Sequence, residues 1–161
     1  MTSLTAEPWQ DHGVVLRPAS GEDADAVAEV LQAAFRATYD FPQVHSDPEV
    51  RQWIRDVVLV TQEVWVAAAA DGSVIAVMAV GADMVEHLYV APGWTGRGIG
   101  SHLLALAKER RPGGLDLWTF QVNTGARRFY ERHGFVEVTR TDGDRNEERQ
   151  PDVRYAWRPT P

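Results

Sequence analysis

Cysteine is absent from the 161 residues, and lysine occurs only once, at Lys108. Without thiols the chain forms no disulfide, no thiolate metal site and no cysteine nucleophile. No apolar run approaches the roughly 18 residues of a membrane-spanning helix, and the longest, Val64 to Ala70, fits a buried strand. Residues 1–12 are polar and lack the basic flank and apolar centre of a secretion signal. We expect a cytoplasmic protein with no membrane partner and no metal.

Positive charge is also scarce, with 16 basic against 23 acidic residues and a net charge of −7. Sequence-independent nucleic-acid binding depends on a basic surface, so we expect no nucleic-acid partner. An acidic balance favours cationic or amine ligands through electrostatic steering. A length of 161 residues is typical of one domain with a single core. We expect a loose lead-in over residues 1–12 and one domain over residues 13–161.

The most informative segment lies between residues 85 and 100. It has a short apolar strand, a Pro-Gly turn and glycines at the alternate positions Gly96, Gly98 and Gly100, followed by a helix from Ser101 to about Arg111. Glycine allows positive φ and a close approach of the backbone to a ligand, and the N-terminus of a helix attracts anions. The segment therefore predicts a site for a phosphate or pyrophosphate.

Several phosphate motifs compete for this segment. A P-loop needs a lysine that the segment lacks, and a plain tight turn with packing glycines is the structural alternative. In a dinucleotide fingerprint, Gly-x-Gly-x-x-Gly, Gly96 and Gly98 would be the first two glycines, but Ser101 occupies the position of the third glycine. Asp116 would be the residue that binds the ribose. That fingerprint also belongs to a βαβ unit near the start of a domain, whereas more than 80 residues come first here. These departures argue against a dinucleotide.

A third motif resembles the acyl-CoA loop of the GNAT superfamily of N-acetyltransferases. That loop has the pattern Gln/Arg-x-x-Gly-x-Gly/Ala after a Leu-Tyr-Val-like strand. Here Leu88-Tyr89-Val90 is followed by Thr95-Gly96-Arg97-Gly98-Ile99-Gly100, which matches both glycine positions. Thr95 departs from Gln/Arg, so one side-chain contact to the phosphates is lost or replaced by a hydroxyl.

A second segment strengthens the resemblance. Residues 123–135 are similar to the family's pattern Asn-x-x-Ala-x-x-Phe-Tyr-x-x-x-Gly-Phe, and they follow a predicted strand over Leu115 to Gln121. Asn123 or Thr124 can cap a helix here, and Gly134 can end it. The structural alternative makes Asn123 only a cap, and makes Phe129, Phe135 and Tyr130 core residues.

The order of elements resembles the GNAT fold from end to end. The resemblance implies an α/β protein with a mixed sheet of about six to seven strands, flanked by about four helices. It also implies that the parallel pair Met84–Val90 and Leu115–Gln121 splays apart to admit the pantetheine arm. The other predicted strands are Val14–Arg17, Val64–Ala70, Val74–Val80, Phe135–Thr139 and Val153–Trp157. The second predicted helix is capped by Asp47 and has an inner face of Val50, Trp53, Ile54 and Val57.

The resemblance implies acetyl-CoA as co-substrate and transfer of its acetyl group to a primary amine by direct attack in a ternary complex. Tyr130 would protonate the leaving thiolate, and Glu86 or His87 would serve as the base. Adjacent strand residues point to opposite faces, so Glu86 is expected with Leu88 on the core side unless a bulge reverses the phase. The residues implied to bind the cofactor are Leu88, Tyr89, Val90, Thr95, Gly96, Arg97, Gly98, Ile99, Gly100, Ser101, Asn123 and Phe129.

The acceptor is expected to be a small-molecule or peptide amine, and a homodimer is left open. By resemblance, the acceptor wall would draw on Tyr39, Phe41, His45, Trp53, Glu147, Glu148, Asp152 and Tyr155. A non-catalytic acyl-CoA-binding regulator is the main alternative function. Thr95 is its only support and Tyr130 argues against it.

Overall fold

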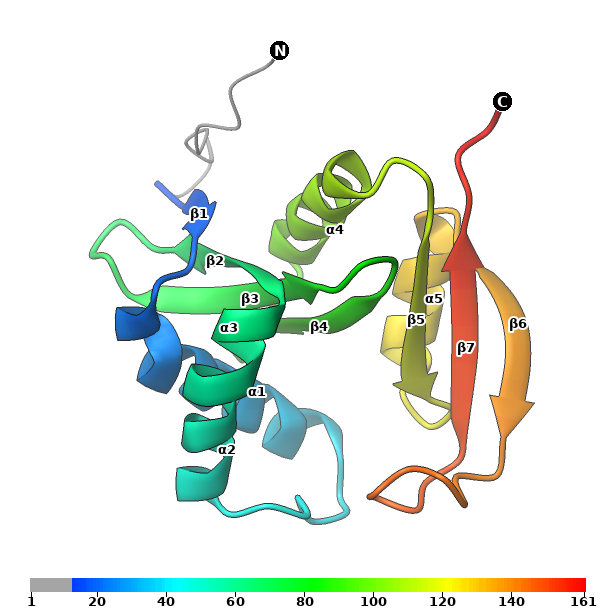
Figure 1. Ribbon diagram of the computed structural model, residues 1–161, viewed down its shortest axis with the longest axis horizontal. Helices are drawn as coiled ribbons and strands as arrows, with labels where there is room; N and C mark the ends of the chain where they lie inside the picture. The colour runs from blue at the N-terminus through cyan, green and yellow to red at the C-terminus, as the bar shows by residue number, and fades with distance from the viewer. Residues whose placement is uncertain (1–12) are drawn as a thin grey trace.

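The computed structural model describes residues 13–161, and the predicted lead-in over residues 1–12 lies outside them. Seven strands form two sheets in this part of the chain (Figure 1). One sheet has the order β1-β2-β3-β4 and the other the order β5-β7-β6. The strands are β1 (Val15–Pro18), β2 (Glu63–Ala68), β3 (Val74–Val80), β4 (Val85–Val90), β5 (Leu115–Phe120), β6 (Val136–Thr141) and β7 (Asp152–Trp157).

Helices cover both faces of the first sheet. On one face lie α1 (Ala24–Thr38) and the continuous helical run of α2 (Asp47–Trp53), a π-helical turn η2 (Ile54–Val58) and α3 (Leu59–Thr61). The opposite face packs on α4 (Ile99–Arg110), and α5 (Thr124–Arg132) follows β5 and lies against the second sheet (Figure 1). A single 3-10 turn, η1 (Gly21–Asp23), precedes α1. No helix over residues 13–161 is long and apolar enough to cross a membrane.

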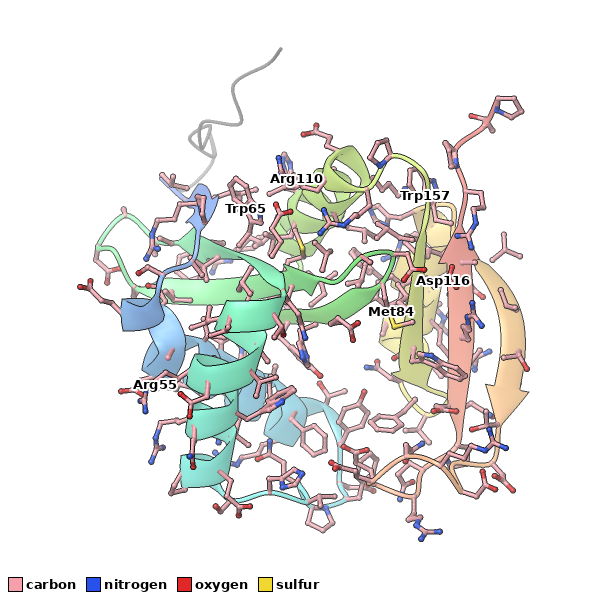
Figure 2. All side chains as sticks on the ribbon, in the orientation of Figure 1. Arg55, Trp65, Met84, Arg110, Asp116 and Trp157 are labelled. Atoms are coloured by element: carbon pink, nitrogen blue, oxygen red, sulfur yellow. The ribbon has the colours of Figure 1, made fainter. Side chains whose placement is uncertain are left out.

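The two sheets meet at one point. An isolated parallel bridge joins Met84 to Asp116, and the Asp116 N–H donates to the Asp83 carbonyl at 2.9 Å. Figure 2 shows these two residues side by side where β4 and β5 begin. No further backbone pairing joins the two strands among the described residues, so they separate beyond this point. The predicted splayed parallel pair is confirmed.

The two predicted C-terminal strands pair as an antiparallel hairpin, β6 and β7, with an arrangement that the sequence did not reveal. The last strand, β7, lies between β5 and β6 and pairs antiparallel with both. Its residue Trp157 is opposite Leu115, and Asp152 is opposite Phe120. The acidic loop between β6 and β7 is thereby carried to the end of β5, beside the space where β4 and β5 diverge (Figure 1).

The second helix departs from its prediction at its start. Ser46, not Asp47, is the cap, because its Oγ accepts from the Glu49 N–H at 3.3 Å and its own N–H donates to Glu49 Oε1 at 3.1 Å. Such a reciprocal pair satisfies two backbone donors at a helix N-terminus. Asp47 becomes the first helical residue and binds Arg36 and Gln32.

The inner face predicted for this helix was also partly wrong. Val50, Ile54 and Val58 are buried, whereas Trp53 and Val57 are 40% and 42% exposed. A π-helical turn contains an extra residue, and it therefore changes which side chains face the sheet. The turn directs Trp53 and Val57 towards the space beside β4, where both line a cavity.

Candidate functional site

A cavity of about 1450 Å³ occupies the space between the diverging strands. It extends from the N-terminus of α4, past β4, to the loops that follow α1 and β6. Of the residues predicted from sequence, the following line it: Glu86, His87, Leu88, Tyr89, Val90, Thr95, Gly96, Gly98, Ile99, Gly100, Ser101, Asn123, Phe129 and Tyr130. Two segments that are distant in sequence therefore meet in one site.

The glycine loop (residues 92–98) ends at the start of α4. Gly93, Gly96 and Gly98 have φ values of +90°, +76° and +82°, a left-handed backbone that other residues rarely adopt. The His102 N–H donates to the Gly98 carbonyl at 3.2 Å and is the first bond of the helix. The N–H groups of Ile99, Gly100 and Ser101 thus have no intrahelical partner. Free donors at the positive end of a helix suit a phosphate group.

Charged side chains near this loop differ from the prediction. The Arg97 guanidinium lies 4.7 Å from the centre of the Trp94 ring, and Arg97 does not line the cavity. Thr95 does line it, in the position of the expected Gln/Arg. The sequence reasoning missed Arg132, the last residue of α5, which is the one arginine among the described lining residues. A positively charged side chain for a phosphate is therefore available from α5, at Arg132, in place of a charged side chain from the glycine loop.

The open edge of β4 supplies a second set of backbone groups. The Ala91 N–H donates to the Ile75 carbonyl at 2.8 Å, and this register continues through Tyr89 and His87 against β3. Because bonding directions alternate in an antiparallel strand, the peptide groups of Leu88 and Val90 face away from β3. They face the gap opposite β5, where no strand pairs with them among the described residues. An extended amide-containing ligand can pair there as an added strand.

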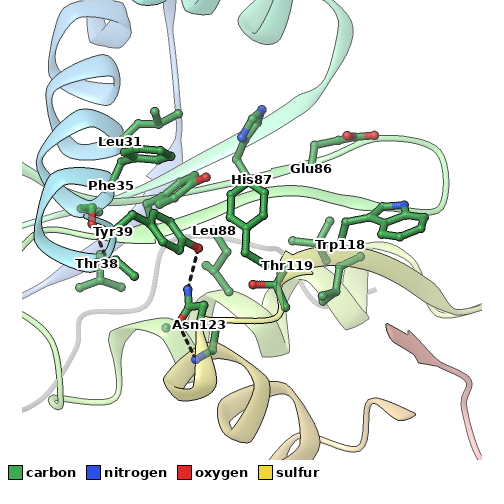
Figure 3. A pocket seen from close by; sticks show the side chains of 18 of the residues that line it. Leu31, Phe35, Thr38, Tyr39, Glu86, His87, Leu88, Trp118, Thr119 and Asn123 are labelled. Atoms are coloured by element: carbon green, nitrogen blue, oxygen red, sulfur yellow. Dashed lines mark hydrogen bonds between the residues drawn. The ribbon is translucent and has the colours of Figure 1, made fainter. Parts of the chain in front are cut away.

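Asn123 lies beyond the far end of β5, on the wall of the cavity. Its Oδ1 accepts from the Ala126 N–H at 3.0 Å, which caps α5, and its Nδ2 donates to the Tyr39 hydroxyl at 2.9 Å. Figure 3 shows this pair of bonds connecting the end of α1 with the start of α5. Tyr39 also packs against Phe41 and Phe120, with ring centres 4.9 and 5.2 Å away. Asn123 is thus both a cap and a link across the site.

Tyr130 lies in α5, about two turns after the Asn123 cap, and faces the core. It is 8% exposed, and burial raises the pKa of its phenol, with Tyr89 and Tyr39 adding to the effect. Its hydroxyl forms no hydrogen bond with any other described residue, although Tyr130 lines the cavity. A phenol with a raised pKa keeps its proton at neutral pH and has that proton available for a ligand.

The two residues predicted as candidate bases are separated by a bulge. Val80 is opposite Val85 and Ala79 is opposite His87, so Glu86 is the extra residue in β4. Because of this bulge Val85 and Leu88 share the core under α4, and Glu86 does not lie on that side, which is the alternative stated above for a bulged strand. Figure 3 shows Glu86 and His87 leaving the strand in different directions. Glu86 is exposed, and partial burial and nearby Asp83 raise its pKa.

His87 points towards the helices. Its ring is 5.2 Å from that of Trp53 and 6.2 Å from that of Tyr89, and its Nδ1 is shut off from solvent without a hydrogen-bond partner. Burial lowers the pKa of His87 to about 4. The imidazole is consequently neutral at physiological pH and presents an unused hydrogen-bonding nitrogen.

The predicted acceptor wall is largely present. Tyr39, His45, Trp53, Glu147, Glu148 and Asp152 line the cavity, whereas Phe41 and Tyr155 do not. The Tyr155 hydroxyl instead accepts from Arg127 Nε and donates to Glu131, both at 3.2 Å. Trp118 and Asp56 line the cavity and were missed. Strand alternation in β5, with Leu117 buried and Trp118 exposed, was the available signal for Trp118.

The residue required by the dinucleotide hypothesis is engaged elsewhere. Asp116 is 5% exposed and forms ion pairs with Arg154 and Arg158, the latter at 2.9 Å. It lies at the junction of the sheets and does not line the cavity. Residues 13–161 also contain no group of three or more His, Asp or Glu side chains arranged to hold a metal ion.

The features present fit a CoA thioester. Free N–H groups at the start of α4 suit its phosphates, and the open edge of β4 suits its amide-containing arm. A Cβ added at Gly100 would be 3.4 Å from the Phe129 ring, so α4 and α5 approach each other closely at this glycine. Tyr130 lies further along the same cavity, with its hydroxyl proton unused.

Comparison with known proteins agrees with this geometry. Residues 61–137 match the family model of the acetyltransferase (GNAT) domain, a range that includes both signature segments. The fold is similar to that of apo YjaB from Escherichia coli, with a TM-score of 0.74 and 22% identity over 89% of this chain and 97% of that one. No curated protein sequence matches the chain.

Two further structures share the fold. A GCN5-related N-acetyltransferase from Rhodopseudomonas palustris has a TM-score of 0.71 and 22% identity, with 99% of both chains covered. The PaiA N-acetyltransferase from Thermoplasma acidophilum, solved in complex with coenzyme A, has a TM-score of 0.67 and 21% identity over 91% of this chain and 99% of that one. Residues 61–137 thus match the GNAT acetyltransferase domain, and residues 13–161 share the α/β fold of these N-acetyltransferases.

Proposed function

We propose that this protein transfers an acetyl group from acetyl-CoA to a primary amine by direct attack in a ternary complex. The observation that supports this most strongly is the meeting, in one cavity, of the glycine loop, the open edge of β4 and the buried Tyr130. The CoA-bound acetyltransferase among the structures of similar fold is consistent with the proposal.

The binding half of the proposal rests on backbone groups. The N–H groups of Ile99, Gly100 and Ser101 hold the pyrophosphate, and Arg132 adds a positive charge. The peptide groups of Leu88 and Val90 bind the pantetheine arm in place of a paired strand. The Val90 N–H also donates to the thioester oxygen, on which negative charge develops during attack.

The proton transfers involve three side chains. A lysine-type amine has a pKa near 10.4 in water, so it must lose a proton before it attacks. His87 is neutral, and its imidazole on the cavity wall accepts a hydrogen bond from the incoming amine and orients the lone pair of that amine. A pKa of about 4 makes His87 a poor final proton acceptor. Glu86, at the mouth, passes that proton to solvent, and Tyr130 protonates the departing thiolate.

Free-thiol release from acetyl-CoA, measured across a panel of primary amines, tests this function. Amine-dependent release with saturation in both substrates is the expected result. Tight acetyl-CoA binding with no release on any amine would favour the acyl-CoA-binding regulator, because the binding features would then be present without turnover. Absence of acetyl-CoA binding would contradict the proposal itself.

A further inference from the structure

The carboxylates of the cavity are all at one end of it. They come from the second helical run, from the start of β4, from the loop between β6 and β7 and from the first residue of β7, and none comes from residues 88–132. They are Glu49, Asp56, Glu86, Glu147, Glu148 and Asp152. The proposed phosphate end therefore has no lining carboxylate among the described residues, and the opposite end, which would receive the acceptor, has six.

Positive charge is missing from the acceptor end. Among the described lining residues Arg132 is the one arginine, and no lysine is present. It lies at the opposite end of α5 from Asn123, beyond Phe129, which packs near Gly100. His45 is held by Glu147, with Nε2 and Oε2 2.9 Å apart, and burial keeps His87 neutral. An acceptor carboxylate would thus find no cationic side chain in this part of the structure.

Three of the six carboxylates are free. Glu49 binds Ser46, Glu147 binds His45, and Asp152 binds Thr141 and Asn146. Asp56, Glu86 and Glu148 have no hydrogen-bond or ion-pair partner among residues 13–161. Glu148 is half-buried, and its charge contributes to the raised pKa of both the Tyr39 and the Tyr89 phenols. It is thus the free carboxylate closest to the interior of the site.

A second observation indicates a ligand at this end. The shielded Nδ1 of His87 has no partner, although the ring lies on the cavity wall. An unpaired buried nitrogen normally costs free energy unless a ligand or solvent satisfies it. Apolar surface is also available, because Trp53 packs against the His87 ring and both Trp53 and Trp118 line the cavity with 40% and 42% of their surface exposed. An amine on an apolar chain would satisfy both the nitrogen and these walls.

We infer that the acceptor is an alkylamine with a second positive charge and no carboxylate, and that Glu148 binds that second charge. This inference rests on the proposed acetyltransferase function. One amine of the acceptor loses a proton to solvent and forms the new C–N bond while the thioester C–S bond breaks. The thiolate takes the Tyr130 proton, and the second proton released by the acylated nitrogen restores the Tyr130 phenol through solvent. The other amine stays protonated beside Glu148, which acts as a specificity-determining residue.

Three acceptors of equal length test the inference, namely hexane-1,6-diamine, hexylamine and 6-aminohexanoate. They differ only in the group at the far end, which is positive, neutral or negative. We expect kcat/KM for the diamine to exceed that for the amino acid by about 100-fold or more, since the free carboxylates attract one terminus and repel the other. Glu148→Gln should lower the value for the diamine about tenfold and that for hexylamine less than about twofold.

Asp144→Asn is the matched control, because it removes one charge from the same loop at an exposed residue that does not line the cavity. It should leave all three values unchanged. Calorimetric titration of each amine into the CoA-saturated protein gives a readout independent of turnover and should show the same order. Equal affinity and equal kcat/KM for the three acceptors, or an unaltered preference in Glu148→Gln, would overturn the inference and leave the proposed function intact. Failure to bind acetyl-CoA would overturn the proposed function.

Discussion

Replacing His87 with glutamine should change how stability depends on pH. The histidine is buried against Trp53 and Tyr89 with its Nδ1 unpaired, and burial lowers its pKa from the ordinary 6.5 to about 4. Between these two values the unfolded chain binds a proton that the folded protein does not bind, so falling pH favours unfolding. Glutamine keeps a polar side chain of similar reach and does not titrate.

The size of the effect follows from the two pKa values. A tenfold change in proton affinity corresponds to about 1.4 kcal/mol. A pKa lowered from 6.5 to about 4 therefore corresponds to about 3 kcal/mol of unfolding free energy. We expect the wild-type protein to lose about this amount relative to His87→Gln as the pH falls from about 7 to about 4. Below the folded-state pKa both states are protonated, so the difference should become constant.

Urea unfolding of both proteins at several pH values in this range measures the difference directly. Carboxylates titrate in the same interval, but they are common to both proteins and cancel in the comparison. His45→Gln is the control with the opposite sign. His45 is exposed and Glu147 raises its pKa, so any stability from that contact is present at low pH and lost as the pH rises. Parallel stability curves for wild type and His87→Gln would refute the argument that the imidazole is held neutral by burial.

Three further substitutions test other parts of the site. Tyr130→Phe should lower kcat by about 100-fold or more. Acetyl-CoA affinity and melting temperature should stay nearly unchanged, because no described residue forms a hydrogen bond with the hydroxyl. An unaltered kcat would remove Tyr130 from the mechanism. Gly98→Val should weaken acetyl-CoA binding by about 100-fold in calorimetry. It should also lower the free energy of unfolding by about 1–2 kcal/mol, because a non-glycine residue is strained at positive φ. Gly72→Val places the same strain (φ +88°) in the hairpin between β2 and β3, so equal acetyl-CoA affinity in the two variants would contradict the anion site. Asn123→Ala should lower the free energy of unfolding by about 1–2 kcal/mol because it removes the α5 cap and the bond to Tyr39, and an unchanged urea midpoint would show that neither bond matters.

Local sequence patterns were sufficient to predict most of the fold. Continuous apolar runs such as Val64–Ala70 marked the buried strands, and the turn between β2 and β3 contains Gly72, which has a φ of +88°. The glycine loop and the helix after Asn123 were also evident, because positive φ and helix capping each require particular residue types. Both are local requirements, so a single sequence reveals them.

Features that depend on contacts between distant segments were not evident. The bulge at Glu86 comes from the register of β4 against β3, and the π-helical turn at residues 54–58 comes from packing of that helix on the sheet. Neither leaves a composition signal of its own. The insertion of β7 between β5 and β6 is a choice among strand pairings that the hairpin pattern leaves open. The bond between Tyr39 and Asn123 joins residues 84 positions apart and depends on all of these.

Calorimetric titration of acetyl-CoA into the wild-type protein, with NAD as the comparison ligand, tests the central claim most directly. The claim is that the glycine loop, the free N–H groups of Ile99, Gly100 and Ser101 and the open edge of β4 form a site for an acyl-CoA. The account predicts saturable binding of one acetyl-CoA per chain and no binding of NAD. Binding of NAD in preference to acetyl-CoA, or no saturable binding of acetyl-CoA, would contradict it.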